Sequence, residues 1–195
     1  MNRDSQGFRI SVSDEMRRAF DPYAHAVTVI NEAHRLIHDG YFFDCSGIVA
    51  SVANGASSDI LLKLPAGTFG HLTFMEYSVG DSPCDVFFYE GTTVSADGTV
   101  ANIRNHNRSA SDTSNTGIYT GPTVTDVGTL LHTRHIPGAA APGQSAGTMV
   151  AGEDAEWVLG NATSATNYMW RITNNSGGAI KLSFHMNGYE IGYES

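Results

Sequence analysis

Residues 84–90, Cys84-Asp85-Val86-Phe87-Phe88-Tyr89-Glu90, form a short apolar run that is rich in aromatic and β-branched side chains. Side chains of these types are favoured in β-strands, and the run has an ordinary strand length. The turn-forming sequence Gly80-Asp81-Ser82-Pro83 precedes it, which marks where the strand starts. We therefore predict one strand over residues 84–90.

Runs of the same kind recur along the chain, separated by turn signals such as Asn54-Gly55 and Asp97-Gly98. These signals suit tight, glycine-dependent connections between antiparallel strands. Eight or more short strands at this spacing are typical of a sandwich or a barrel. The sequence therefore predicts an all-β fold, an antiparallel β-sandwich, and residues 31–39 suit one short helix. The predicted strands lie within residues 27–30, 41–53, 59–64, 71–79, 84–90, 99–105, 129–136, 156–160, 168–173 and 179–186.

Charge divides the chain into an N-terminal arm and a body. Residues 1–35 hold five basic and five acidic side chains, so the whole net charge of −9 belongs to residues 36–195. Pro22 ends any helix in the arm early, and the apolar residues there have no evident local core. We expect an extended arm over residues 1–30 and a β-sandwich domain over residues 31–195. No internal repeat at a fixed period is visible.

The composition excludes several classes of function. A net charge of −9 has the wrong sign for gripping phosphate backbones, so we expect no nucleic-acid partner. No run approaches 18 apolar residues, so we expect no membrane span. The N-terminus MNRDSQGFRI does not read as a signal peptide, which predicts synthesis in the cytoplasm. Cys45 and Cys84 lie in separate apolar runs and are expected to be buried thiols.

A possible catalytic pattern occurs at residues 143–147, where Gly-Gln-Ser-Ala-Gly matches the nucleophile elbow of serine hydrolases. Asp154 and His185 follow Ser145 in the order of such a triad. The elbow needs a buried strand before the serine and a helix after it, whereas small residues and Pro142 surround Ser145. We interpret residues 137–152 as a long loop of small residues and expect no catalytic residue.

Histidines and asparagines raise two further possibilities. The pairs His34 with His38 and His132 with His135 lack the glutamate of H-E-x-x-H, and the second pair would point to opposite faces of a strand. We therefore expect no metal and no other cofactor. Residues 102–111 concentrate hydrogen-bonding side chains, and we interpret them as an ordered connection, with a polar binding loop as the alternative.

Six segments together carry a resemblance to a known family and span about 140 residues of the chain. The chain resembles the small jelly-roll-like proteins that decorate or cement the capsids of tailed bacteriophages, also called head-stabilising proteins. None of the segments is a catalytic motif. The segments are HRLIHDGYFF (34–43), VFFYEGTT (86–93), NIRNHNRS (102–109), PTVTDVGTLL (122–131), EWVL (156–159) and WRITNN (170–175).

This resemblance implies a jelly-roll-like sandwich and a structural role in the virion. The protein would bind the outer surface of the capsid and bridge subunits of the major capsid protein, with no enzymatic activity. It would form a closed homo-oligomer, a trimer in preference to a dimer. Under this reading the arm binds the capsid through six residues, which are Phe8, Ile10, Arg17, Arg18, Phe20 and Tyr23.

An alternative function is a receptor-binding or glycan-binding domain of a phage fibre or head fibre. Aromatic rings stack on sugars, but aromatic residues spread over sandwich strands more often belong to the core. The alternative therefore depends on which rings face solvent. The rings in question belong to Tyr77, Phe87, Phe88, Tyr89, Trp157, Tyr168 and Trp170.

Overall fold

The computed structural model describes residues 32–78, 82–138 and 156–192. By its contacts the chain divides into residues 1–35 and 36–195. The arm over residues 1–30 lies outside the described residues, so its extended form stays a prediction. No helix among the described residues has the length and apolarity needed to cross a membrane.

The described residues are mostly strand. Helix α2 (Glu32–Asp39) occupies the stretch where the sequence suits a helix. The strands are β1 (Phe42–Val52), β2 (Ser57–Leu64), β3 (Thr68–Ser78), β4 (Cys84–Glu90), β5 (Thr93–Ala96), β6 (Thr99–Val100), β7 (Ile103–Asn105), β8 (Gly117–Thr120), β9 (Thr123–Asp126), β10 (Thr129–Ile136), β11 (Trp157–Gly160), β12 (Thr166–Asn174) and β13 (Ile180–Gly192).

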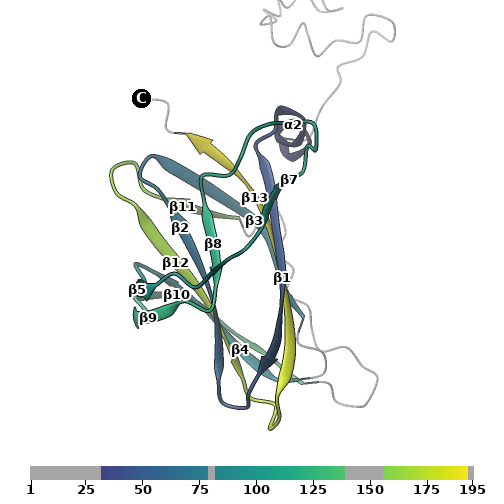
Figure 1. Ribbon diagram of the computed structural model, residues 1–195, viewed down its shortest axis with the longest axis vertical. Coiled ribbons are helices and arrows are strands. Elements are labelled where there is room, and N and C mark those ends of the chain that lie inside the picture. Colours follow the sequence, from purple (N-terminus) through teal and green to yellow (C-terminus); the bar gives the residue numbers. More distant parts are fainter. Residues whose placement is uncertain (1–31, 79–81, 139–155, 193–195) are drawn as a thin grey trace, which may run out of the picture. The chain divides into compact units, whose positions relative to one another are not determined.

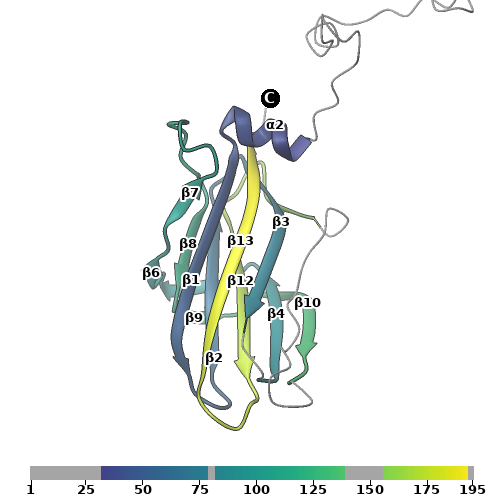
Figure 2. The same ribbon diagram turned by 90° about the vertical axis from the view of Figure 1, so that its right-hand side faces the viewer.

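Two antiparallel sheets pack face to face as a sandwich (Figures 1 and 2). One sheet has the strand order β11-β3-β13-β1-β7 and the other β10-β4-β12-β2-β8-β6. Along the chain, β1 to β4 and β10 to β13 alternate between the sheets, except that β4 and β10 are neighbours in one sheet. This order is the double Greek key of a jelly roll, which confirms the predicted fold class.

The core lies between the two sheets and is built from the inward-facing residues of both. Trp170, Phe88 and Ile172 come from the six-stranded sheet, and Leu182 and Met186 come from the five-stranded sheet. Each of these side chains is at most 2% exposed. Burying such side chains is the main source of stability for a domain of this size.

Both cysteines are buried free thiols, as predicted. Cys45 is 1% exposed and Cys84 is 0% exposed. Burial, with a smaller effect of the neighbouring Asp44 carboxylate, raises the pKa of Cys45 to about 11. The thiolate is therefore scarce at neutral pH, and Cys45 behaves as an apolar core residue.

One predicted strand was wrong. Residues 99–105 divide into β6, which pairs with β8, and β7, which pairs with β1 in the other sheet. Between them, Ala101 and Asn102 carry the chain from one sheet to the other (Figure 1). A single apolar run in the sequence therefore belongs to both layers, because the chain crosses the side of the sandwich at this point.

A third sheet, of the two strands β5 and β9, lies on the outer side of the six-stranded sheet (Figure 1). Leu61 and Met169 point to that face, away from the core, and are nevertheless 0% exposed. The cover is held by Lys63, whose Nζ lies 2.8 Å from Asp97 Oδ2. Asn167 also donates its Nδ2 to the backbone carbonyl of Thr92, at 3.0 Å.

The cover contains a short internal repeat that the sequence analysis missed. Residues 91–99 (GTTVSADGT) and 121–129 (GPTVTDVGT) share their two glycines, a Thr-Val pair and a final threonine. In both copies the glycines have positive φ, between 65° and 91°. The two copies pair with each other, and Val94 lies opposite Val124. The repeat forms two similar turns that pair with each other, and it is too short to fold independently.

Candidate functional site

One side of the sandwich, where β1 and β2 lie, is closed over only part of its length. The crossing segment with β6 and β7 closes the upper part (Figure 1), because β7 pairs with β1 at Phe43–Cys45 and β8 pairs with β2 at Ile60–Lys63. Within the described residues, no strand pairs with this edge of β1 beyond Cys45. The same holds for β2 at Ser57–Asp59.

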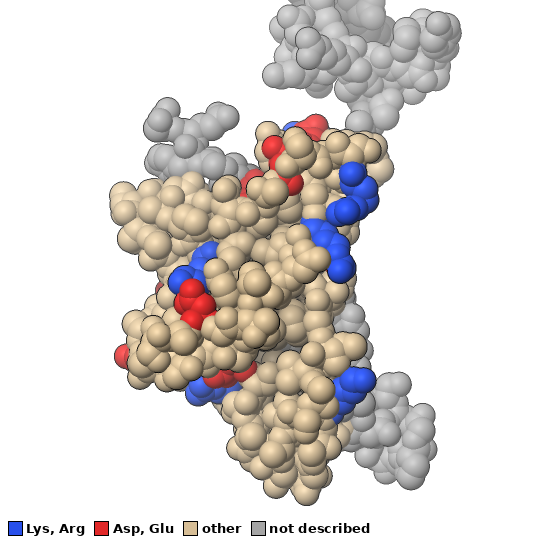
Figure 3. Space-filling model, viewed as in Figure 1, with Lys and Arg blue, Asp and Glu red and all other residues tan. Residues whose placement is uncertain are grey.

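A cleft of about 490 Å³ lies along this open part. Its walls are residues 48–53 and 56–59, and residues 120–122 close one end. In Figure 3, which faces this side, the surface between β1 and β2 carries few charged side chains. Ile48, a large apolar residue of the wall, is 66% exposed.

The charged residue Asp59 in the wall of the cleft is paired with Arg171, so the two charges cancel. Arg171 donates from Nε and Nη2 to the two carboxylate oxygens of Asp59, at 2.8 and 2.7 Å. Donating these hydrogen bonds to Asp59 raises the pKa of the Arg171 guanidinium further. Such a two-point contact fixes both side chains in one geometry. The pair therefore holds β2 to β12 and leaves the cleft close to neutral.

The open edge of β1 presents backbone hydrogen-bonding groups. His106 donates its N–H to the carbonyl of Phe42, at 2.9 Å, so the backbone groups of Phe42 face β7. In an antiparallel pair, every second residue faces the same neighbour. The N–H and C=O of Ser46 and Ile48 therefore face the open edge, because the first residue of β7, Ile103, lies opposite Cys45.

Cys45 points into the core between the two sheets. Because side chains alternate along a strand, those of Ser46 and Ile48 point to the outer face of the five-stranded sheet. On that face a hollow of about 440 Å³ is lined by residues 46–48 of β1 and 183–185 of β13. It is shallow at Gly47, where the ring of Phe184 lies directly beneath the backbone. The surface around Ser46 and Ile48 is therefore concave both at the edge of the sheet and on its outer face.

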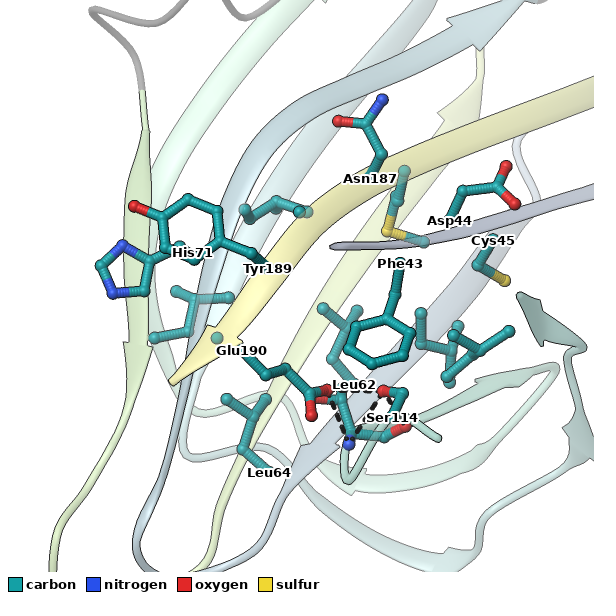
Figure 4. Close-up of a pocket in the computed structure, with 18 residues that line it drawn as sticks. Phe43, Asp44, Cys45, Leu62, Leu64, His71, Ser114, Asn187, Tyr189 and Glu190 are labelled. Atoms are coloured by element: carbon teal, nitrogen blue, oxygen red, sulfur yellow. Dashed lines mark hydrogen bonds between the residues drawn. The ribbon is translucent and has the colours of Figure 1, made fainter. Parts of the chain in front are cut away.

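A separate cavity between the two sheets has a volume of only about 60 Å³ (Figure 4). Its walls are mostly apolar, and the Glu190 carboxylate lies at one end. That carboxylate accepts hydrogen bonds from Ser114 Oγ and from the backbone N–H groups of Asn115 and Thr116. Ligand pockets for sugars or nucleotides are several times larger, so this cavity has room for a few water molecules only.

The asparagine-rich residues 102–111 form an ordered connection, as interpreted from the sequence. Asn105 is buried and donates its Nδ2 to the carbonyl of Gly40, at 2.6 Å, while its Oδ1 accepts the N–H of Asn107. Asn107 in turn donates its Nδ2 to the carbonyl of His38, at 2.9 Å. These amides hold the connection against the end of α2, so they are not available to bind a ligand.

The histidines lie apart. His135 Nδ1 is 2.8 Å from Asp85 Oδ1, while the His132 ring lies 6.3 Å from that of Trp157, so the two point to opposite faces as predicted. The hydrogen bond from His135 holds the pKa of Asp85 below its ordinary value. Among the described residues, no three His, Cys, Asp or Glu side chains are grouped as metal ligands.

The described part of the chain does not bring together the residues of the serine-hydrolase pattern. It does not bring together those of the predicted capsid-binding arm either. Ser145 and Asp154 lie outside the described residues, and His185 Nε2 lies 3.3 Å from the carboxylate of Asp44. The arm residues Phe8, Ile10, Arg17, Arg18, Phe20 and Tyr23 also lie outside them. The capsid-binding arm therefore stays a prediction, and so does the expectation that residues 143–147 are not a catalytic motif.

Sequence reasoning missed the open edge of β1. Residues 41–53 form one apolar run, and nothing in it shows where a neighbouring strand ends. The available signal is negative, because residues 46–53 contain neither a charge nor a proline, the features that usually protect an open strand edge.

Comparison with known proteins adds no relative. No protein-family model matches the chain, and no curated protein matches it in sequence. The function is therefore argued from the resemblance of the six segments and from the geometry described above.

Proposed function

We propose that this protein is a structural protein of a tailed-bacteriophage virion that binds the outside of the capsid and stabilises it by bridging subunits of the major capsid protein. The proposal starts from the resemblance of six segments to decoration proteins. Those segments form the end of α2 and parts of β1, β4, β7, β9 to β12. A jelly roll is also frequent among capsid proteins, although a fold alone does not decide a function.

The observation that carries the proposal is how the chain uses its polar residues. Asn174, 0% exposed, donates its Nδ2 to the carbonyls of Val52 and Gly178, at 2.8 and 2.7 Å. Asn105, Glu190 and the Asp59–Arg171 pair likewise tie loops and strands together. The polar clusters thus stiffen a scaffold, and the cleft of about 490 Å³ lies beside an open strand edge. This arrangement suits attachment to another protein.

A decoration protein gains its strength from many contacts at once. When one oligomer binds several shell subunits, each further contact forms at a high effective concentration. A closed homo-oligomer, a trimer in preference to a dimer, matches the symmetry axes of a shell. The body, which carries the whole charge of −9, would face solvent and keep virions apart by like-charge repulsion.

The glycan-binding alternative has less support. Phe88, Tyr168 and Trp170 are at most 3% exposed, so their rings are not offered to a sugar. The aromatic residue with the largest exposure among the described residues is Tyr41, at 49%. One isolated ring makes a weak platform for a glycan.

Cosedimentation of the purified protein with expanded capsids that lack it tests the proposal. We expect saturation at a copy number comparable to that of the major capsid protein. A few copies per particle would favour a fibre-like role, and no binding at all would contradict capsid decoration. Binding of the purified protein to host surface glycans in the same preparation would support the alternative.

A further inference from the structure

We propose that the open edge of β1 at residues 46–50 binds an extended segment of the partner protein, which pairs with β1 as an added strand in line with β7. This inference rests on the proposed function, in which the partner is the major capsid protein. It names the part of the body that makes the contact and the kind of segment that it binds.

The edge of β1 at residues 46–50 lacks the protection that the other open edges of the described residues have. Exposed strand edges are normally blunted by charge, by proline or by shortness, because unpaired N–H and C=O groups recruit other strands. β10 carries Arg134 and His135, β7 carries Arg104, and β6 and β11 have only two and four residues. Residues 46–50 are Ser-Gly-Ile-Val-Ala, with no charge and with Ile48 66% exposed.

The hydrogen-bonding geometry of this edge also suits an added strand. Ser46 and Ile48 each present an N–H and a C=O toward the open edge, continuing the direction in which Phe42 already accepts a bond from His106. An incoming strand therefore meets a ladder that is already formed on its other side, since β13 pairs with β1 from Phe42 to Val49. Strand addition of this kind draws its affinity from main-chain hydrogen bonds.

The position of β7 limits which occupant fits. A second copy cannot pair symmetrically through residues 46–50, because antiparallel pairing centred on Ile48 places residues 51–53 of one β1 against residues 43–45 of the other. Those positions are already occupied by β7. The occupant is therefore a segment that brings no strand of its own on that side, as an extended loop or terminus of a shell subunit does.

The surroundings define the chemistry of the segment. The cleft of about 490 Å³ at the edge and the hollow of about 440 Å³ on the sheet face both border Ile48. The small side chains of Ser46 and Ser183 leave room on the face. We therefore expect a segment of about five residues, uncharged, with apolar side chains at alternate positions that lie against Ile48.

The test compares variants of the full chain in cosedimentation with expanded capsids that lack the protein. Ser46→Pro removes an N–H that faces the open edge and leaves the N–H groups that bond to β13 in place, and Ile48→Lys places a charge on the edge. The matched control is Val158→Lys, since Val158 is 60% exposed on β11 at the opposite edge of the same sheet. We expect at least tenfold weaker binding for both β1 variants and unchanged binding for the control, with equal thermal unfolding of Ile48→Lys and the control.

Amide hydrogen exchange separates the remaining outcomes. We expect the Ser46 and Ile48 amides to exchange quickly in the free protein and at least tenfold more slowly on the capsid. Capsid binding by the wild type without this protection, or with both variants binding normally, overturns the edge inference and leaves the proposed function standing. Slow exchange in the free protein means that the edge is filled by this chain or by a second copy, which also overturns it. If the wild type binds no capsid, the proposed function fails and the inference fails with it.

Discussion

The indole ring of Trp170 on β12 stacks on the ring of Phe88 on β4, with centroids 3.7 Å apart and planes inclined by 13°. Both side chains are 1% exposed, and their strands are neighbours in the six-stranded sheet. Tyr168 and Trp157 also contact the ring of Phe88. Phe88 is therefore the centre of the aromatic part of the core.

Replacing Phe88 by alanine should lower the free energy of unfolding by about 3–5 kcal/mol, because it opens a cavity and removes these ring contacts. Trp170→Phe should cost less than Phe88→Ala. The Trp170 Nε1–H has no hydrogen-bond partner among the described residues, so its removal sacrifices no bond. Urea denaturation of both variants checks the order, and an equal loss of stability would contradict it.

Gly160 occupies a position that only glycine fits. Its φ is 108°, and a Cβ there would lie 2.1 Å from the carbonyl oxygen of Thr68. Gly160→Ala should therefore destabilise the protein by at least about 2 kcal/mol, since backbone strain and a backbone clash add. Gly177→Ala is the matched control, because Gly177 has a φ of 82° with open space around it. The control should cost only about 1 kcal/mol in thermal unfolding.

Glu190 holds the loop at residues 114–116 through its carboxylate, with 2.8 Å to the N–H of Asn115 and 3.0 Å to that of Thr116. In Glu190→Gln an amide NH₂ replaces one acceptor and opposes these donors, so we expect a loss of about 1–3 kcal/mol. Hydrogen exchange should speed up at Asn115 and Thr116. Unchanged exchange at both amides would show that the loop holds its place without the carboxylate.

The Asp85–His135 pair gives stability a specific dependence on pH. The pKa of Asp85 is lowered on folding, chiefly by the hydrogen bond from His135. A carboxyl with a depressed folded pKa contributes stability that is present above its unfolded pKa and is lost as pH falls through the folded value. Below about pH 4, the stability of Asp85→Asn should therefore fall less steeply than that of the wild type. Parallel curves from urea denaturation at pH 7, 4 and 3 would refute this role.

Much of the fold follows from local sequence. The run at residues 84–90 became β4 with its predicted bounds, because alternation and β-branched or aromatic side chains act within a few residues. The predicted burial of Cys45 and Cys84 and the opposite orientation of His132 and His135 followed from the same local patterns.

Other features depend on distant partners. Residues 99–105 read as one strand, but the pairing partners Tyr119 and Cys45 belong to different sheets and draw the two halves apart. β5 and β9 were not predicted, since each has only four residues and is stable only against the other and over Leu61 and Met169. Only contacts far apart in the sequence decide such elements.

The sequence by itself determined the all-β class, the turn positions and a largely apolar core, because these depend on the periodicity and composition of short segments. The folded chain alone places the start of β7 beside Cys45, so that Ser46 and Ile48 have β13 on one side and, among the described residues, no strand on the other. The physical reason is that a strand edge is open or closed according to what packs beside it. The hydrogen-bonding capacity of its backbone is the same in every sequence.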